Sequence, residues 1–244
     1  MAQTHRNDVM SAFSKMWDMI YDVTFDPSRM EGRVIVNVSY VDRDDLDRVI
    51  EIYREVDRSG ISLSPYIKIL EREGYRTLEI MTICSMTIDG LLLKHGIPIN
   101  PIGGGVLCVR DGMGVRFTHF LKYESTTMDP LEVLAGMGLT SILKVVRTGS
   151  GRILGNMREV PMVAREDTEA ILGEVIDSGF RGIIEVGEPN AELFDIPTER
   201  DHFGVVIVGG MNPVIAAEEE GVRVETHAMK GVVEISTMEK ISDV

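Results

Sequence analysis

The chain has 244 residues, of which 44% are hydrophobic and 26% charged, an ordinary balance for a folded globular protein. Its net charge of −14 opposes direct binding to nucleic acid, because neutralising phosphates supplies most of the affinity in such complexes. No apolar run reaches the ~20 residues that cross a bilayer and no signal peptide leads the chain, so we expect a cytoplasmic protein that is not bound to a membrane.

The first expected element is an amphipathic helix over residues 10–21. Its apolar residues recur at helical spacing: Met10, Phe13, Met16, Trp17 and Ile20. One helix is too short for a helix-turn-helix module, which needs two or three. Residues 1–31 are therefore predicted to be a helix and lead-in that pack on the rest of the protein. The alternative is that this helix binds another protein.

Residues 32–125 are predicted to form a first β-α-β-β-α-β unit, the ferredoxin-like split motif. Valine-rich or alternating runs predict strands over 33–41, 64–71, 76–84 and 104–110. One helix follows Asp42, a residue suited to an N-cap, and ends at Gly60. A second helix is expected from Thr87 to Gly96.

Residues 151–244 repeat this order. Strands are expected over 152–160, 182–187, 202–209 and 222–235, the last interrupted near Lys230 and Gly231. One helix ends at Gly179, and another begins at Asn212-Pro213 and stops at Gly221. The structured connector, residues 126–150, follows a strand over 115–124. It is expected to hold a helix over 131–135, opened by Asp129-Pro130, and a strand over 141–146.

The two units are predicted to be an internal duplication, because identical residues recur in register. A shift of 119 positions and then of 125 aligns these pairs: Asn37 with Asn156, Ile52 with Ile171, Glu55-Val56 with Glu174-Val175, Ser59-Gly60 with Ser178-Gly179, Met86 with Met211, and Gly96 with Gly221. The predicted fold class is α+β. Two ferredoxin-like pseudo-repeats pack into one body, with antiparallel or mixed sheets and helices on one face. A ligand site is expected in the crevice between the halves.

Two matched strand-to-helix junctions, residues 82–87 and 208–212, are the first candidate site. The start of a helix carries unpaired N–H groups and a partial positive charge, which favour a carboxylate or phosphate. Ser85, Thr87 and Asn212 add side-chain donors at these junctions. The alternative interpretation is ordinary helix capping without a ligand.

A second candidate lies just before the helix of the connector, where Thr126 and Thr127 offer hydroxyl groups. Arg116, Lys122 and Arg158 are the nearest cations in sequence. A small dicarboxylate needs two separate anion sites, and arginine forks with hydroxyl-lined helix starts meet that need. The alternative is that each arginine is an ordinary surface residue, as isolated arginines more often are.

Signatures of known enzyme chemistry are missing from the sequence. There is no nucleophile elbow and no phosphate-binding loop, and the five histidines are scattered, so no metal site is predicted. Cys84 and Cys108 lie in apolar runs and are expected to be buried, reduced thiols. The enzyme alternative is an activity on a small oxo-acid with Cys84 as nucleophile, because a helix start lowers a thiol pKa. His95 follows on the same predicted helix.

Several segments together resemble one known family, the regulatory domain of NrpR, a nitrogen-responsive transcriptional repressor of methanogenic archaea. The segments are GRVIVNVS (32–39), SPYIK (64–68), CSMTIDGLLLKHGIP (84–98), YESTTMDPLE (123–132), GLTS (138–141), NMREVP (156–161) and VGGMNP (208–213). They occur in the order of the family and cover about residues 24–236. Ser125 departs from the pattern, because the family would place glycine before the paired threonines.

The resemblance implies a regulator without catalytic activity that binds 2-oxoglutarate, the metabolite that accumulates when nitrogen is scarce. It further implies a homodimer. Complete members carry a winged helix-turn-helix, which residues 1–31 cannot form. The chain is therefore expected to be a co-repressor that binds a DNA-binding NrpR-type protein, with a trimmed chain as the alternative. The residues expected to contact the carboxylates are Ser85, Thr87, Thr126, Thr127, Arg116 and Arg158. A purely structural dimerisation domain is the third interpretation.

Overall fold

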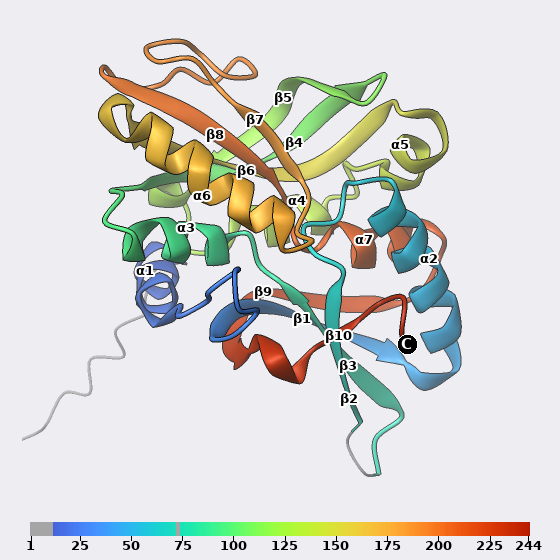
Figure 1. Cartoon of the computed structure of the whole chain (residues 1–244). Helices are drawn as coiled ribbons and strands as arrows, with labels where there is room; N and C mark the ends of the chain where they lie inside the picture. The colour runs from blue at the N-terminus through green and yellow to red at the C-terminus, as the bar shows by residue number, and fades with distance from the viewer. Residues whose placement is uncertain (1–11, 72–73) are drawn as a thin grey trace, which may run out of the picture.

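Two five-stranded antiparallel sheets form the frame of an α+β fold in the computed structural model, which describes residues 12–71 and 74–244. The strand order is β10-β2-β3-β1-β9 in the first sheet and β5-β4-β6-β8-β7 in the second. Figure 1 shows the second sheet above the first, with helices α3 and α7 at the level between them. Every helix of the described residues is too short or too polar to cross a bilayer.

All but one of the predicted strands are present, with boundaries that move by a few residues. The first sheet contains β1 (Arg33–Asp42), β2 (Tyr66–Glu71), β3 (Thr77–Ile83), β9 (Val224–Glu234) and β10 (Glu239–Lys240). The second sheet contains β4 (Asn100–Arg110), β5 (Met113–Lys122), β6 (Gly151–Pro161), β7 (Ile183–Val186) and β8 (His202–Val208). The expected interruption of the last long strand is a register shift in the pairing of β9 with β1, between Gly231 and His227.

Seven α-helices are present in the described residues. They are α1 (Ala12–Asp22), α2 (Leu46–Arg58), α3 (Met86–Lys94), α4 (Pro130–Gly136), α5 (Ile142–Thr148), α6 (Arg165–Asp177) and α7 (Asn212–Glu219). Met10, the first residue of the predicted N-terminal helix, lies outside the described residues. Short 3-10 turns follow β1, β5, β6 and β9: η1 (Arg43–Asp45), η2 (Tyr123–Ser125), η3 (Met162–Ala164) and η4 (Ile235–Thr237).

Each sheet has the strand order of the split β-α-β motif, but the final strand of each unit is exchanged. Strand β4 leaves the first unit and pairs with β6, where Leu107 lies opposite Ile153. Strand β9 leaves the second unit and pairs with β1, where Val232 lies opposite Ile35. One continuous cluster of buried side chains therefore extends across both sheets.

The element boundaries keep the register of the predicted repeat. Both ends of α6 follow those of α2 by 119 residues, and both ends of β8 follow those of β3 by 125 residues. These are the two shifts that aligned the identical residues in the sequence.

The predicted strand over residues 141–146 is wrong, because this segment is helix α5. The short apolar run suits either structure, and the deciding contact comes from elsewhere in the chain. The Glu219 carboxylate on α7 accepts hydrogen bonds from the backbone N–H groups of Ile142 (2.8 Å) and Leu143 (3.0 Å). It therefore caps the first turn of α5, and nothing near residue 141 reveals this cap.

The exchange of strands predicts that neither unit folds alone. In a fragment of residues 1–125, β1 lacks β9 and β4 lacks β6, which leaves long unpaired edges. We expect each of the fragments 1–125 and 126–244 to lack a cooperative thermal transition by circular dichroism. A refolded equimolar mixture should recover the transition of the intact chain. A monomeric fragment 1–125 that unfolds cooperatively would contradict the exchange.

Candidate functional site

The two predicted strand-to-helix junctions meet at the centre of the molecule. The first runs from Ile83, the end of β3, into α3, and the second runs from the end of β8 through Gly210 into α7. A side chain at Gly210 would overlap the carbonyl oxygen of Ile83 and crowd the amide nitrogen of Asn37 at 2.9 Å. The two corners therefore pack directly on each other, and glycine is required at this point.

The same backbone hydrogen bond ties each corner to the first strand of its own unit. The N–H of Cys84 donates to the carbonyl of Ile35 at 2.8 Å, and the N–H of Gly209 donates to the carbonyl of Leu154 at 2.8 Å. Ile35 and Leu154 are equivalent positions of the repeat. Both corners thus turn away from their sheets in the same way.

A side chain early in each helix completes this arrangement. The Thr87 hydroxyl accepts from the N–H of Ile35 (3.0 Å) and lies 3.3 Å from its carbonyl oxygen. Asn212 accepts from the N–H of Leu154 (3.0 Å) and donates to its carbonyl (3.1 Å). Both side chains are buried, so Thr87, a predicted ligand contact, holds the corner in place. Its hydroxyl is already used by the backbone.

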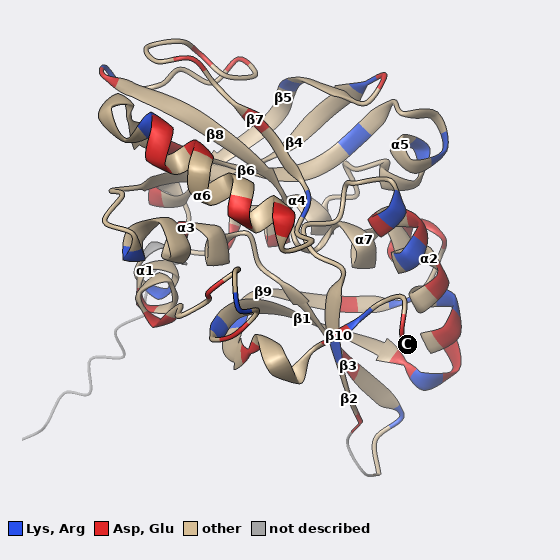
Figure 2. Ribbon diagram, in the orientation of Figure 1, with Lys and Arg blue, Asp and Glu red and all other residues tan. Residues whose placement is uncertain are grey.

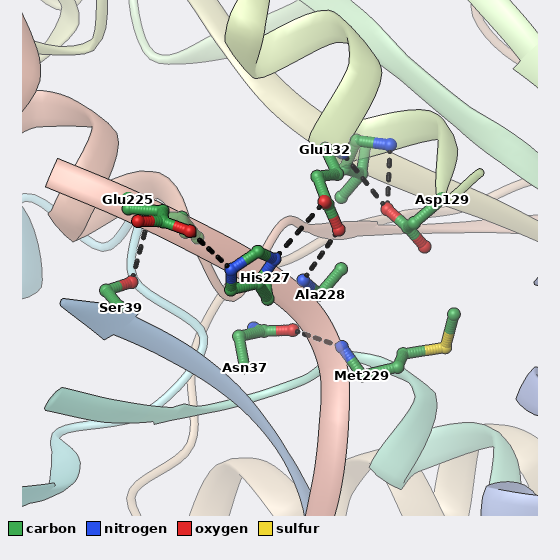
Figure 3. A network of polar contacts seen from close by, with 10 residues as sticks. Asn37, Ser39, Asp129, Glu132, Glu225, His227, Ala228 and Met229 are labelled. Atoms are coloured by element: carbon green, nitrogen blue, oxygen red, sulfur yellow. Dashed lines mark hydrogen bonds and ion pairs between the residues drawn. The ribbon is translucent and has the colours of Figure 1, made fainter. Parts of the chain in front are cut away.

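Two repeated asparagines point from the first strands toward the corners. The Asn156 side chain accepts a hydrogen bond from the Ser85 hydroxyl (2.7 Å) and donates to the Tyr123 hydroxyl (2.7 Å). The Asn37 side chain accepts from the N–H of Met229 at 3.2 Å, as Figure 3 shows. Asn156 reaches the corner of the other unit, so it links the two halves of the molecule through side chains.

A small cavity, which we call the inner chamber, lies where the corners meet. Its polar lining consists of Asn37, Cys84, Ser85, Tyr123, Asp129 and Asn156. Gly210 and Met211 of the second corner complete the wall, so the cavity joins both corners. Its volume of about 10 Å³ suits about one water molecule. A larger guest enters only if the corners separate.

A second cavity, the outer chamber, adjoins the inner one. It has a volume of about 180 Å³ and is lined by Lys15, Thr127, Met128, Asp129, Glu132, Ala228 and Met229. Asp129 and Ala228 line both cavities, so the outer chamber lies next to the inner one on the side of these two residues. Helix α1, helix α4 and strand β9 all contribute to its walls.

Carboxylates dominate the electrostatics of the outer chamber. The Asp129 side chain caps α4 by accepting from the N–H groups of Leu131 (2.9 Å) and Glu132 (3.2 Å). Burial raises its pKa to about 6, although these two hydrogen bonds act in the opposite direction. Glu132 accepts from the N–H of Ala228 (3.1 Å) and lies 3.5 Å from His227 (Figure 3). Protonation of Asp129 therefore removes a negative charge that would repel an anionic ligand in this cavity.

Arg158, a predicted contact for a ligand carboxylate, binds a carboxylate of the protein itself. Its guanidinium donates to both oxygens of Asp89 on α3, at 3.0 and 2.8 Å, and to the carbonyl of Asn156 at 3.1 Å. Both charged side chains are fully buried. The ion pair fastens α3 of the first unit to β6 of the second.

The remaining predicted contacts are divided between the outer chamber and the surface. Thr127 lines the outer chamber and is exposed. The Thr126 hydroxyl closes a local turn with the backbone of Met128 at 3.0 and 3.1 Å. Arg116 is exposed on the edge strand β5 and lines neither chamber. The structure thus gathers Ser85 and Thr127 at the chambers and leaves Thr126 and Arg116 outside their walls.

Sequence reasoning missed several residues that line the chambers. Asn37 and Asn156 carried a signal, because they are identical at equivalent positions of the repeat. Tyr123 and Lys15 gave none, since each reaches the cavity only through tertiary packing. No three His, Cys, Asp or Glu side chains converge as metal ligands in the described part of the chain.

Comparison with known sequences assigns the chain to a protein family. The family described as NrpR regulatory domains NRD1 and 2 matches residues 9–240. The chain belongs to the NrpR regulatory domain family. The expected family is therefore confirmed, and the match covers nearly all of the described residues.

Characterised relatives of this NrpR regulatory domain are named as nitrogen regulators. The chain is 36% identical over 234 residues to the global nitrogen regulator NrpRI of Methanosarcina mazei, covering 93% of this chain and 72% of that protein. It is 32% identical over 236 residues to the global nitrogen regulator NrpR of Methanocaldococcus jannaschii, covering 97% of this chain but only 41% of that protein. A crystal structure of a nitrogen repressor-like protein from Methanococcus jannaschii aligns with a TM-score of 0.84 at 32% identity, over 95% of this chain and 99% of that one.

The structure also bears on the enzyme alternative for this NrpR domain. Burial raises the pKa of the Cys84 thiol to about 12, which disfavours the reactive thiolate at neutral pH. His95 caps the far end of α3, with its Nδ1 atom 2.9 Å from the Leu91 carbonyl. With a rise of 1.5 Å per residue, roughly 15 Å of helix separates it from Cys84. The relatives are named as regulators, in agreement with a role other than catalysis.

The buried ion pair predicts a strong coupling between Arg158 and Asp89. Arg158→Met leaves the Asp89 carboxylate buried without a partner and should lower the free energy of unfolding by about 3–5 kcal/mol. Replacing Asp89 by Leu in the same chain should recover most of this loss. Urea unfolding of the two single variants and the double variant measures the coupling. Losses that simply add would show that the two charges do not depend on each other.

The Asp129 carboxyl predicts a pH-dependent stability. Its folded-state pKa of about 6 exceeds the ordinary 3.8, so the folded protein holds this proton more tightly than the unfolded chain. The free energy of unfolding therefore falls as pH rises from about 4 to about 6. Asp129→Asn keeps a capping side chain and removes this loss, with a gain of about 1–3 kcal/mol above pH 6 and none below pH 4.

Chemical unfolding at several pH values checks this gain. The matched control is Asp177→Asn, at an exposed residue near the end of α6. The gain is expected for Asp129→Asn alone. Identical pH profiles for the two variants would mean that burial of the Asp129 carboxyl does not lower the free energy of unfolding of the protein.

Proposed function

We propose that this chain is an effector-sensing transcriptional co-repressor of nitrogen regulation that binds 2-oxoglutarate in the cytoplasm. Membership of the NrpR regulatory domain family and the names of the relatives support this role. The observation that carries the proposal is the inner chamber, where the corners of both units meet among side-chain hydrogen-bond donors. A guest that bridges the corners stabilises one arrangement of the two halves over another.

The proposed effector enters by the outer chamber and reaches the inner one. One carboxylate would replace the contacts that Ser85, Asn156 and Tyr123 now make with one another. Thr127 would meet the effector nearer the surface. Because the inner chamber holds about one water, binding requires the corners to move apart. The effector thus selects an open arrangement, and only a difference in affinity between the arrangements shifts their populations.

The six predicted contact residues take different parts in this proposal. Ser85 and Thr127 contact the effector, since they line the two chambers. Thr87 and Arg158 act indirectly, because they hold α3 against β1 and β6. Arg116 and Thr126 fall outside the proposed site.

We further propose that the chain forms a homodimer and acts through a DNA-binding NrpR-type protein. The net charge of −14 opposes direct contact with phosphates. Figure 2 shows acidic and basic residues interleaved on helix α2, whereas α6 is mainly acidic. The chain spans less than half the length of one relative that is named a global nitrogen regulator, so DNA binding fits another protein segment. Duplication of an ancestral unit accounts for the matched element boundaries.

Thermal unfolding with and without 2-oxoglutarate tests the proposed function. A ligand at 100 times its dissociation constant adds about 2.7 kcal/mol, which raises the melting temperature by about 5–10 °C in a chain of this size. Glutarate, which lacks the 2-oxo group, should give a smaller shift. The variants Ser85→Ala and Thr127→Ala should each weaken binding about 2- to 10-fold in calorimetry.

The control variant is Ser242→Ala, at an exposed residue close to the C-terminus. It should bind 2-oxoglutarate as the unaltered chain does. An unaltered chain that shows no thermal shift at millimolar 2-oxoglutarate would favour a purely structural dimerisation domain.

A further inference from the structure

Helix α1 packs closely on helix α3, which begins at the inner chamber. The α1 side chains of Met16 and Ile20, and Val23 just after the helix, are buried. At Gly90 of α3, an added Cβ atom would lie 2.5 Å from the Val23 side chain and 2.8 Å from the Ile20 carbonyl oxygen. The two helices therefore touch through a glycine.

Helix α1 also supplies a cation to the outer chamber. Lys15 is half-buried there, next to Met16, which points into the core. Its positive charge acts on the Asp129 carboxyl and lowers the pKa of that group, against the larger effect of burial. The carboxylates of Asp129 and Glu132 line the same cavity, so Lys15 places one positive charge beside two acidic groups.

Other cations are unsuited to meet an anion in these chambers. Arg158 is fully buried and already engaged by Asp89. Arg116 and Lys122 are exposed on β5 and line neither chamber. Among the residues that the structure describes, Lys15 is the cation that lines the outer chamber.

We propose that the Lys15 ammonium binds one carboxylate of the effector and that α1 thereby shifts along α3. This inference rests on the proposed function and names the regulated element of the same site. A dicarboxylate in the two chambers has one end at Ser85, immediately before α3, and the other at Lys15 on α1. It therefore touches both helices of the packed pair and changes how they lie on each other.

The α3 side of this pair is held firmly, so α1 is the part that moves. The Asp89 carboxylate next to Gly90 is fixed by the buried guanidinium of Arg158. The Thr87 side chain is bonded to the backbone of β1. The contact of α1 with Gly90 of α3 is made by the Val23 side chain and the Ile20 backbone, and such packing allows sliding more readily than directed hydrogen bonds do.

The chain carries its own probe of α1. Trp17 is the single tryptophan of the sequence and follows Met16 on this helix, with its ring centroid 6.0 Å from that of Tyr21. Its fluorescence therefore reports the surroundings of α1 alone. We expect 2-oxoglutarate to change the Trp17 emission of the intact chain with the same half-saturation as the heat of binding.

Calorimetry and Trp17 emission are compared in three variants of the full chain. Lys15→Gln removes the ammonium and should weaken 2-oxoglutarate binding about tenfold or more, as for the loss of a hydrogen bond to a charged group. Lys144→Gln, at an exposed lysine of α5, is the matched control and should bind as the unaltered chain does. Gly90→Ala should displace α1, so Trp17 emission differs before ligand is added and responds less to it.

The outcomes separate this inference from the proposed function. If the unaltered chain binds 2-oxoglutarate but Lys15→Gln binds equally well, Lys15 is not a contact and the inference is overturned while the function stands. If binding leaves the Trp17 emission unchanged, the shift of α1 is overturned. If the unaltered chain releases no heat with 2-oxoglutarate, the proposed function itself is lost.

Discussion

The whole structure depends on one crossing point, where the chain passes twice from one sheet to the other. After β3 and again after β8, the chain turns into a helix and delivers its next long strand to the opposite sheet. The two turns lie in contact with each other, with Gly210 packed against the carbonyl of Ile83. Since neither sheet is complete without a strand from the other unit, the crossing fixes how the halves lie and creates the cavity between them.

This crossing brings polar side chains of both units together at the centre of the protein. The contacts there are short hydrogen bonds between side chains of different units, such as that of Ser85 with Asn156. Opening them changes the relation between the sheets, whereas a guest on an outer surface would leave it unaltered. The symmetry is incomplete, because the ion pair of Asp89 and Arg158 has uncharged Val214 and Ser39 at the equivalent positions. One corner is therefore fastened more firmly than the other.

Much of the secondary structure could be predicted because its signals are local. Alternating or valine-rich runs indicated the strands, and Asp129-Pro130 and Asn212-Pro213 marked helix starts that the structure contains. The failure at α5 has a clear cause, since its cap comes from Glu219, about 77 residues further along the chain. Among the predicted site residues, Ser85 and Thr127 line the chambers, and their contact with a ligand stays a prediction. Arg158 does not line them, because its charge is satisfied by a partner that spacing alone could not indicate.

The sequence by itself determined most of the elements and the family to which the chain belongs, and its two shifts of identical residues predicted the repeat. Periodicity and helix caps depend on residues close together in the sequence. Identical residues in register are found by aligning two segments of the chain. Only the tertiary structure decided which sheet receives β4 and β9, which carboxylate Arg158 binds, and that Lys15 and Tyr123 line adjoining cavities. These depend on contacts between distant segments, whose choice rests on the packing of the complete chain.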